Sequence, residues 1–113
     1  MSGGAWDYDQ YKLQYIADGI EDYIERNDEK PDWWDDEFDE WTGGIYGKDT
    51  MEEFKKAIAY LKIAEIYAQR ADWLVSGDDG EEQFHERLRK DLAEAITTDK
   101  YGYVEKILNK EIL

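Results

Sequence analysis

The chain has 113 residues, enough for one small domain with a single core but not for two. It carries 29 acidic and 14 basic residues, so its formal net charge is −15 at pH 7. This charge argues against direct binding to nucleic acid or anionic lipid, because both require a cationic protein surface. Aromatic residues make up 15% of the chain and hydrophobic residues 42%, which indicates a folded domain and not a disordered acidic tail.

The sequence also excludes several kinds of site and targeting signal. It contains no cysteine, so disulfides and thiolate metal sites are excluded. Residues 1–7 lack the basic and apolar segments of a signal peptide. No apolar run approaches the roughly 18 residues that a membrane-spanning helix needs. We therefore expect a soluble, cytoplasmic protein.

The first predicted helix runs from Asp7 to about Arg26. Its apolar residues recur at three- and four-residue steps, as in an amphipathic helix. They are Tyr8, Tyr11, Tyr15, Ile16, Ile20, Tyr23 and Ile24. Because a buried tyrosine hydroxyl requires a polar partner, we expect this stripe to lie at the edge of the core or to line a groove.

Residues 28–49 form an acidic, aromatic-rich insert between the first and second predicted helices. Pro31 suits the first position of a short helical turn. The insert interleaves large rings with carboxylates, in particular Trp33, Trp34, Asp35, Asp36, Asp39, Glu40 and Trp41. Aromatic side chains are common anchors of protein interfaces, so the insert is a candidate docking surface. A solvated loop whose tryptophans cover the core is the alternative.

The second predicted helix begins with Thr50 as its N-cap, because Glu53 completes a capping box three residues later. It continues to about Val75 and is apolar on more than one side, which is typical of a central helix. Gly77 suits the left-handed position that follows a helix. Asp79 then provides the N-cap of the third helix.

The third predicted helix has one apolar side and is followed by a short helix from about Lys100 to Ile112. Its apolar residues are Phe84, Leu88, Leu92, Ala95 and Ile96, and the last helix adds Val104, Ile107 and Leu108. No segment shows the alternation of a strand. The sequence therefore predicts a single all-α domain over residues 1–113, a compact bundle of three longer helices plus short helices.

Charge is distributed unevenly along the chain. Residues 1–27 carry a net charge of −4, residues 28–49 carry −7 and residues 77–98 carry −4, whereas residues 50–76 and 99–113 are neutral. On the first predicted helix, neighbouring carboxylates about 5–6 Å apart share one face. They are Asp18, Glu21, Asp22 and Glu25. This row resembles the anionic ladder of a nucleic-acid strand and predicts a presented binding surface. A uniform solubility coat is the alternative.

Catalytic motifs are absent from the sequence. The only serines, Ser2 and Ser76, lie in no nucleophile elbow, and there is no phosphate-binding fingerprint. The single histidine, His85, lacks a second imidazole with which to form a metal site. We therefore expect no enzymatic activity and no cofactor. Carboxylates cluster at residues 78–82, but their spacing does not fit an EF-hand, and a turn between helices explains them equally well.

A basic-aromatic pocket for a nucleotide-like ligand is the other candidate site. Lys62 with Tyr67 and Arg70 could form it, or Arg87 with Trp73, since guanidinium groups bind phosphates and stack on rings. Salt bridges to the abundant carboxylates explain the same basic residues more simply.

Two segments of the sequence resemble a family of small, largely uncharacterised phage and prophage proteins. The first is Gly3-Gly4-Ala5-Trp6-Asp7-Tyr8, which matches G-G-x-W-x-Y. The second is Ser76-Gly77-Asp78-Asp79-Gly80-Glu81-Glu82-Gln83-Phe84, preceded by Asp72-Trp73-Leu74-Val75, and it matches S-G-D-x-G-E-E-x-F. The resemblance spans most of residues 3–92 and implies a phage accessory protein in the host cytoplasm, of a kind that often blunts host defence. It carries over no catalytic residue.

Charge and resemblance together predict an inhibitor of a host defence system, such as an anti-restriction or anti-CRISPR protein. The expected mechanism is occupation of a basic, nucleic-acid-binding surface on a defence nuclease or effector complex. The predicted partner-binding residues are Asp18, Asp22, Glu25, Trp33, Trp34, Asp35, Asp36, Asp39, Glu40 and Trp41. One alternative is a sponge that sequesters a nucleotide immune signal through Lys62, Tyr67, Arg70, Trp73 and Arg87. A small structural or assembly protein of the phage is the other.

Overall fold

The structure is a computed structural model that describes residues 5–30, 33 and 44–112. These residues form four α-helices and no strand. The helices are α1 (Tyr11–Glu25), α2 (Lys48–Val75), α3 (Glu81–Thr98) and α4 (Tyr103–Ile112). The all-α class expected from the sequence is therefore confirmed.

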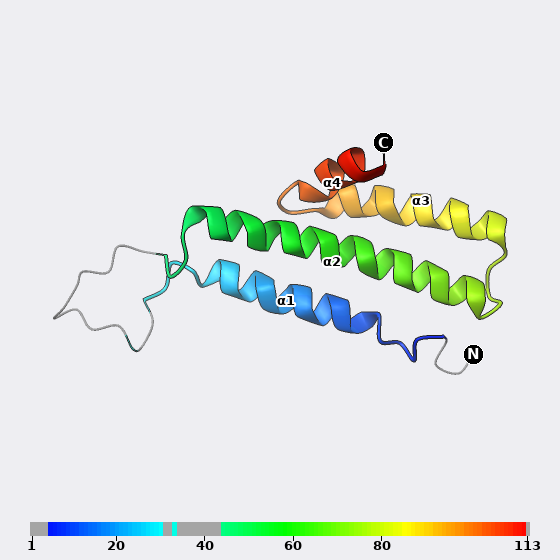
Figure 1. The fold of residues 1–113 in the computed structure, drawn as a ribbon, viewed down its shortest axis with the longest axis horizontal. Helices are drawn as coiled ribbons and strands as arrows, with labels where there is room; N and C mark the ends of the chain where they lie inside the picture. Colours follow the sequence, from blue (N-terminus) through cyan, green and yellow to red (C-terminus); the bar gives the residue numbers. More distant parts are fainter. Residues whose placement is uncertain (1–4, 31–32, 34–43, 113) are drawn as a thin grey trace.

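The three long helices lie side by side in the order α1, α2, α3, with neighbouring helices antiparallel (Figure 1). α2 contacts each of the other three helices, whereas no contact joins α1 to α3 within the described residues. The 28 residues of α2 span about 42 Å, while the shortest extent of the molecule is 18 Å. The central position of α2 is as predicted. The finer expectation of a compact bundle is not confirmed, since α1 and α3 do not contact each other within the described residues and the long helices form a row with α2 in the middle.

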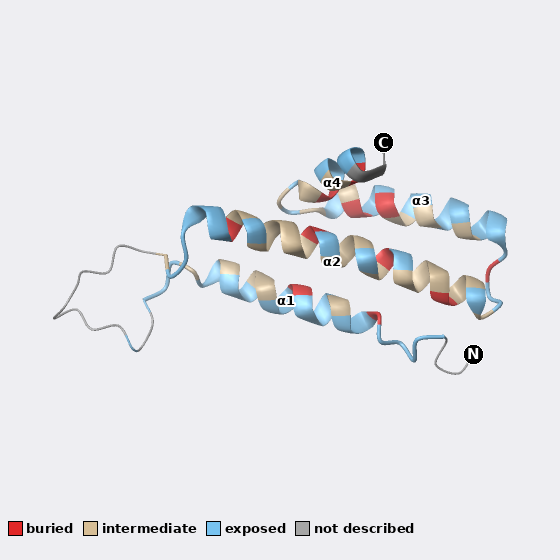
Figure 2. Ribbon diagram, in the orientation of Figure 1, coloured by how far each residue is buried: buried red, intermediate tan, exposed pale blue. Residues whose placement is uncertain are grey.

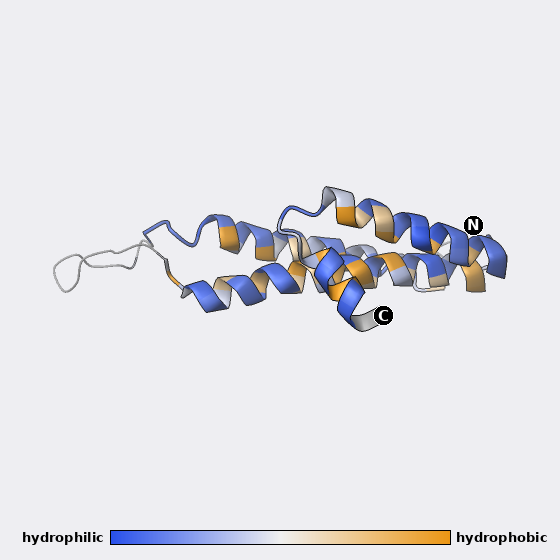
Figure 3. Ribbon diagram, turned by 90° about the horizontal axis from the view of Figure 1, so that it is seen from above, coloured by the Kyte–Doolittle hydropathy of each residue, from blue (hydrophilic) through white to orange (hydrophobic). Residues whose placement is uncertain are grey.

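The hydrophobic core lies between α2, α3 and α4. Its buried members are Ala59, Ile66, Leu92, Ala95, Val104 and Leu108, all at most 9% exposed. In Figure 2 the buried positions, in red, recur at intervals along α2 and on the part of α3 next to α4. Ala17 is the one buried residue of α1. Each helix alternates hydrophobic and hydrophilic residues along its length (Figure 3), as amphipathic helices do.

The buried face of α1 differs from the predicted stripe. Ile20 and Ile24 are half-buried as expected, but Tyr11, Tyr15 and Ile16 are exposed, with 80% of Tyr15 accessible. Ala17 takes the buried position instead. Tyrosine hydroxyls are more easily satisfied by water than by a core, so the helix is turned to place the small residue against its neighbour.

The ends of the acidic insert are held together by Asn27. The Asn27 side chain accepts a hydrogen bond from the Tyr46 N–H (2.9 Å) and donates one to the Tyr46 carbonyl (3.1 Å), and the Asn27 carbonyl accepts one from the Ile45 N–H (2.8 Å). We call these three bonds the clamp at Asn27. After it, α2 begins earlier in the sequence than predicted. The N-cap is Gly47, not Thr50, so Thr50 lies inside the helix and residues 48–49 belong to α2.

The turn between α2 and α3 is close to the prediction in one respect and different in another. Gly77 has φ +85°, the left-handed conformation expected after a helix. The N-cap of α3 is Gly80 and not Asp79. The Gly80 N–H donates to Oε1 of Gln83 (2.7 Å), while the Asp79 side chain is buried against basic residues. Glu81 and Glu82 lie in the first turn of α3, where their negative charges interact favourably with the helix dipole.

Candidate interaction site

The predicted acidic row lies along α1, and three of its members are exposed. Asp22 pairs with Arg26 (3.0 Å) and Glu25 with Lys100 (3.6 Å), and each carboxylate side chain is 57% exposed. Asp18 accepts a hydrogen bond from the neutral amide of Gln14 (2.8 Å). Ion pairs at such exposed positions contribute little stability. These carboxylates can therefore exchange their present partners for cations on another molecule at small cost.

Glu21, the fourth carboxylate of the row, has a different role. It accepts hydrogen bonds from the Tyr101 hydroxyl (2.6 Å) and from Nζ of Lys100 (2.8 Å), which lie between α3 and α4. Burial alone would raise the pKa of Glu21, but the bonds from Lys100 and Tyr101 outweigh it and lower this pKa. Burial and the bond to Glu21 raise the pKa of Tyr101 to about 12. These bonds tie α1 to the opposite side of α2, and we call them the Glu21 clasp.

The aromatic part of the predicted surface lies mostly outside the described residues. Trp33 is described and is 73% exposed. The remaining predicted positions of the insert are not described; they are Trp34, Asp35, Asp36, Asp39, Glu40 and Trp41. The clamp at Asn27 fixes where the insert leaves and rejoins the helices, next to the end of α1 that carries Glu25. The two predicted parts of the site therefore start from the same end of α1.

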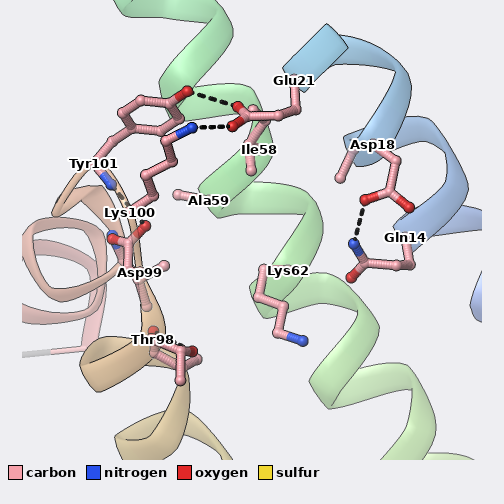
Figure 4. Close-up of a pocket in the computed structure, with 13 residues that line it drawn as sticks. Gln14, Asp18, Glu21, Ile58, Ala59, Lys62, Thr98, Asp99, Lys100 and Tyr101 are labelled. Carbon is pink, nitrogen blue, oxygen red and sulfur yellow. Dashed lines mark hydrogen bonds and ion pairs between the residues drawn. The ribbon is translucent and has the colours of Figure 1, made fainter. Parts of the chain in front are cut away.

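A cavity of about 280 Å³ separates α1 from the end of α3, with the side of α2 as its back wall (Figure 4). Figure 4 shows Gln14 and Asp18 on α1 facing Thr98 and Asp99 across it, with the Glu21 clasp at one end. The full lining is Gln14, Ala17, Asp18, Glu21, Ile58, Ala59, Lys62, Ala95, Thr98, Asp99, Lys100, Tyr101 and Val104. The sequence alone does not predict this cavity. The sequence feature behind it is an alanine on the inner face of each long helix. These alanines indicate a cavity only when the relative position of the helices is known.

The structure brings together only part of the alternative ligand site. Arg70, Trp73 and Arg87 line one cleft of about 240 Å³, and the Arg70 guanidinium lies 4.6 Å from the Trp73 ring centre. Lys62 lines a different cavity and pairs with Glu65 (3.6 Å), while Tyr67 is exposed and lines neither the cleft nor that cavity.

The arginines of that cleft are engaged in ion pairs. Arg70 pairs with Asp91 (2.6 Å) and with Asp79 (3.6 Å), and Asp79 also accepts from Arg87 (2.5 Å). The Asp79 side chain is 1% exposed. Removing one member of such a buried network would leave an uncompensated charge. The main role of the cleft residues is therefore to hold α2 and α3 together.

The two segments that carry the phage-protein resemblance meet at one end of the molecule. Gly3 and Gly4 lie outside the described residues, but Ala5 and Trp6 lie against the end of α2. The Ala5 N–H donates to Oδ1 of Asp72 (2.6 Å), and Nε1 of Trp6 donates to the Ala68 carbonyl (2.9 Å). The first segment therefore packs on the C-terminal end of α2, which leads into the second segment, and we call residues 5–10 together with Asp72 the N-terminal latch.

Asp72 is the centre of this latch. It is 1% exposed and also accepts hydrogen bonds from Nε2 of Gln10 (3.0 Å) and from the Ser76 hydroxyl (3.0 Å). The bond from the Ala5 N–H lowers the pKa of Asp72, against the opposing effect of burial. No cation pairs with Asp72 among the described residues. Neutral donors therefore hold this carboxylate in its charged form, as donors at an N-cap do.

Nothing in the described part of the chain forms a metal site. No group of three or more His, Asp or Glu side chains there could hold an ion, and this covers the carboxylates of residues 78–82. His85 is exposed and packs edge-on against the Phe84 ring, 5.1 Å between centres. No described helix is long and apolar enough to cross a membrane.

Comparisons with known proteins give no family assignment. No protein-family model matches the chain, no curated protein matches it and no solved structure matches its fold. The likeness to phage proteins therefore stays a prediction from the two sequence segments.

Proposed function

We propose that this protein is a phage-encoded inhibitor that binds a basic, nucleic-acid-type surface on a host defence nuclease or effector complex. The observation that carries this proposal is the arrangement of charge around α2. The neutral helix is central, and the helices on either side of it, α1 and α3, carry net negative charge. The helices that flank α2 therefore present negative charge where a partner can reach it, and residues 28–49 carry the largest share of the excess along the chain.

Three features favour α1 as the contacting element. Its row of Asp18, Asp22 and Glu25 is exposed, and its partners are surface groups that can be displaced. The row lies on the exposed face of α1, away from the buried Ala17, so substitutions in it do not disturb the core. Complementary charge speeds encounter and favours partners with a basic surface. The insert follows α1 along the chain, and we propose that its carboxylates and tryptophans add to the contact.

A plaque assay tests the proposal. The chain is expressed in bacterial strains that each carry one nuclease-based defence system, and the efficiency of plating of a targeted phage is measured. We expect the wild-type chain to restore plating against at least one system and the triple variant D18K/D22K/E25K to lose this effect. The matched control is E53K/E86K/E105K, which makes the same change in charge at exposed positions on α2, α3 and α4.

The outcomes separate mimicry from other mechanisms. If the wild-type chain restores plating against no system, the proposed role in defence is wrong. If the α1 triple variant remains active, or if the control triple variant loses activity equally, the carboxylates of α1 are not the contact. With a purified partner, affinity should fall steeply between about 50 and 200 mM salt, as it does for phosphate contacts. The reversal D35K/D36K/D39K tests the insert in the same assay, and we expect it to abolish inhibition.

A further inference from the structure

We infer that the cavity between α1 and the end of α3 is a pocket for one long basic side chain of the partner, an arginine or a lysine. This inference rests on the proposed function, because it names what a basic partner inserts into the acidic face. It adds a defined receptor site to what would otherwise be a general attraction between charges.

The floor of the cavity is apolar and is built from small residues. Ala17 of α1, Ala59 of α2 and Ala95 of α3 are each at most 5% exposed, and all three line the cavity. Ile58 and Val104 complete the apolar part. Three alanines at facing positions leave a space that larger residues would fill. Such a floor accommodates the methylene stem of lysine or arginine, which packs readily on apolar surface.

The cavity is large enough to admit one long side chain. Its volume is about 280 Å³, close to the lower end of the range of about 300 to 1,000 Å³ for small-molecule pockets. The cavity is open to the surface between α1 and the segment that joins α3 to α4 (Figure 4). A side chain presented by another protein can therefore enter it from outside.

The rim of the cavity selects for a cation. Lys100 is held by Glu21 (2.8 Å) and Lys62 by Glu65 (3.6 Å), so both rim ammonium groups already face carboxylates. Asp99 accepts from the Val104 N–H (2.8 Å) and thereby caps α4. Among the described residues, Asp18 is bonded only to the neutral Gln14 amide, so no cation in this part of the chain pairs with it. A guanidinium or ammonium group at the mouth would supply the missing partner through a charge-assisted hydrogen bond.

The test is an NMR titration of the full chain with N-acetyl-L-arginine amide, which carries the arginine side chain and a single positive charge. We expect saturable shifts in the amides of Ala17, Ala59 and Ala95, with a dissociation constant on the order of 1 mM for so small a probe. The neutral isostere N-acetyl-L-citrulline amide should produce no saturable shifts there. It serves as the matched control probe.

Two variants and a matched control variant localise the binding. D18N should weaken binding of the arginine probe about tenfold, the loss typical of a hydrogen bond to a charged group. Thr98→Phe should block the cavity from its exposed rim without altering the core. D22N makes the same charge change one turn along α1 at a residue that does not line the cavity. It should leave the affinity for the probe nearly unchanged.

The results that overturn the inference differ from those that overturn the proposed function. Three results would each overturn the pocket. They are equal binding of the citrulline probe, non-saturable shifts spread over all exposed carboxylates, and unchanged binding by Thr98→Phe. None of these measurements requires the partner. A negative titration together with a charge-dependent plaque assay would therefore reject the pocket alone. A positive titration with no restored plating would reject the defence role alone.

Discussion

The two sides of α2 are held by different physical forces. On the side of α3 and α4, alanine, isoleucine, leucine and valine side chains form the buried core. On the side of α1, Ala17 is buried and Ile20 and Ile24 are half-buried, and two networks of hydrogen bonds, the Glu21 clasp and the N-terminal latch at Asp72, add to this packing. Burial of apolar surface is the dominant source of stability, so the fully buried side chains of α2, α3 and α4 contribute most per residue. The helix that carries the proposed binding surface has one fully buried residue and relies on polar networks as well.

The largest effect is expected from removing a core side chain on the α3 side. Leu92 is 9% exposed, and Leu92→Ala should lower the free energy of unfolding by about 3 kcal/mol, as buried leucine truncations do. Ile24 on α1 is only half-buried, so Ile24→Ala should lower the free energy of unfolding by only about 1 kcal/mol. Urea unfolding followed by circular dichroism measures both. Equal losses for the two variants would contradict the division between the two sides.

A more local effect is expected from Asp72→Ala. Loss of the carboxylate removes the acceptor of the Ala5 N–H and one of the two acceptors of the Gln10 amide, which keeps its bond to Gln69, so the attachment of residues 5–10 to α2 should loosen. Hydrogen exchange should then quicken in residues 5–10 and α1, with α3 and α4 unchanged. Ser76→Ala removes one donor to the same carboxylate and is the milder control. A uniform increase in exchange across all four helices would show that the latch supports the whole fold.

The same latch predicts loss of stability in acid. Because the folded pKa of Asp72 is lowered from 3.8, its contribution is present above pH 3.8 and is lost as pH falls through the lowered value. Thermal melts of the wild-type chain should show a loss over this range, and Asp72→Ala should show a smaller one. Identical acid profiles for the two proteins would contradict the charged state of the buried carboxylate.

The helices of this protein could be predicted from sequence because their signals are local. The apolar period of three and four residues, the glycine at position 77 and the neutral charge of the second helix each depend on neighbours along the chain. The caps at Thr50 and Asp79 were predicted incorrectly because tertiary contacts override local capping. Asn27 fixes the approach to α2, and two arginines draw the Asp79 side chain inward.

The candidate site could be predicted only in part, for the same reason. The exposed carboxylates of α1 follow from the helical period and the amphipathic pattern. The inward turn of Glu21 depends on Lys100 and Tyr101, which are about 80 residues away in sequence. The alanine-floored cavity likewise depends on the relative alignment of three helices, and no local pattern encodes it. The two sequence segments lie far apart along the chain, and only the fold shows that the first contacts Asp72 at the start of the second.

Gly77→Ala should have a smaller effect that does not depend on either side of α2. Gly77 has φ +85° and a methyl group there would meet nothing within 4 Å, so the cost is that of the left-handed backbone alone, about 1 kcal/mol. Gly19→Ala on the exposed face of α1, also with open space around it, should stabilise the helix by up to about 1 kcal/mol. Thermal denaturation measures whether each variant is less stable or more stable than the wild-type chain. A stabilising Gly77→Ala would show that the turn can relax out of the left-handed conformation.

The smallest effect is expected at high pH and reports on the Glu21 clasp directly. Tyr101 has its pKa raised from 10.0 to about 12, so the unfolded chain releases this proton before the folded chain does. The contribution of the clasp is therefore fully present below pH 10 and is lost as pH rises from 10 to about 12. Tyr101→Phe should reduce this part of the alkaline loss, while Tyr60→Phe, an exposed tyrosine on α2, should not. If both variants follow the wild-type profile, the hydroxyl of Tyr101 does not hold α1 in place, and the polar attachment of that helix rests on the latch at Asp72.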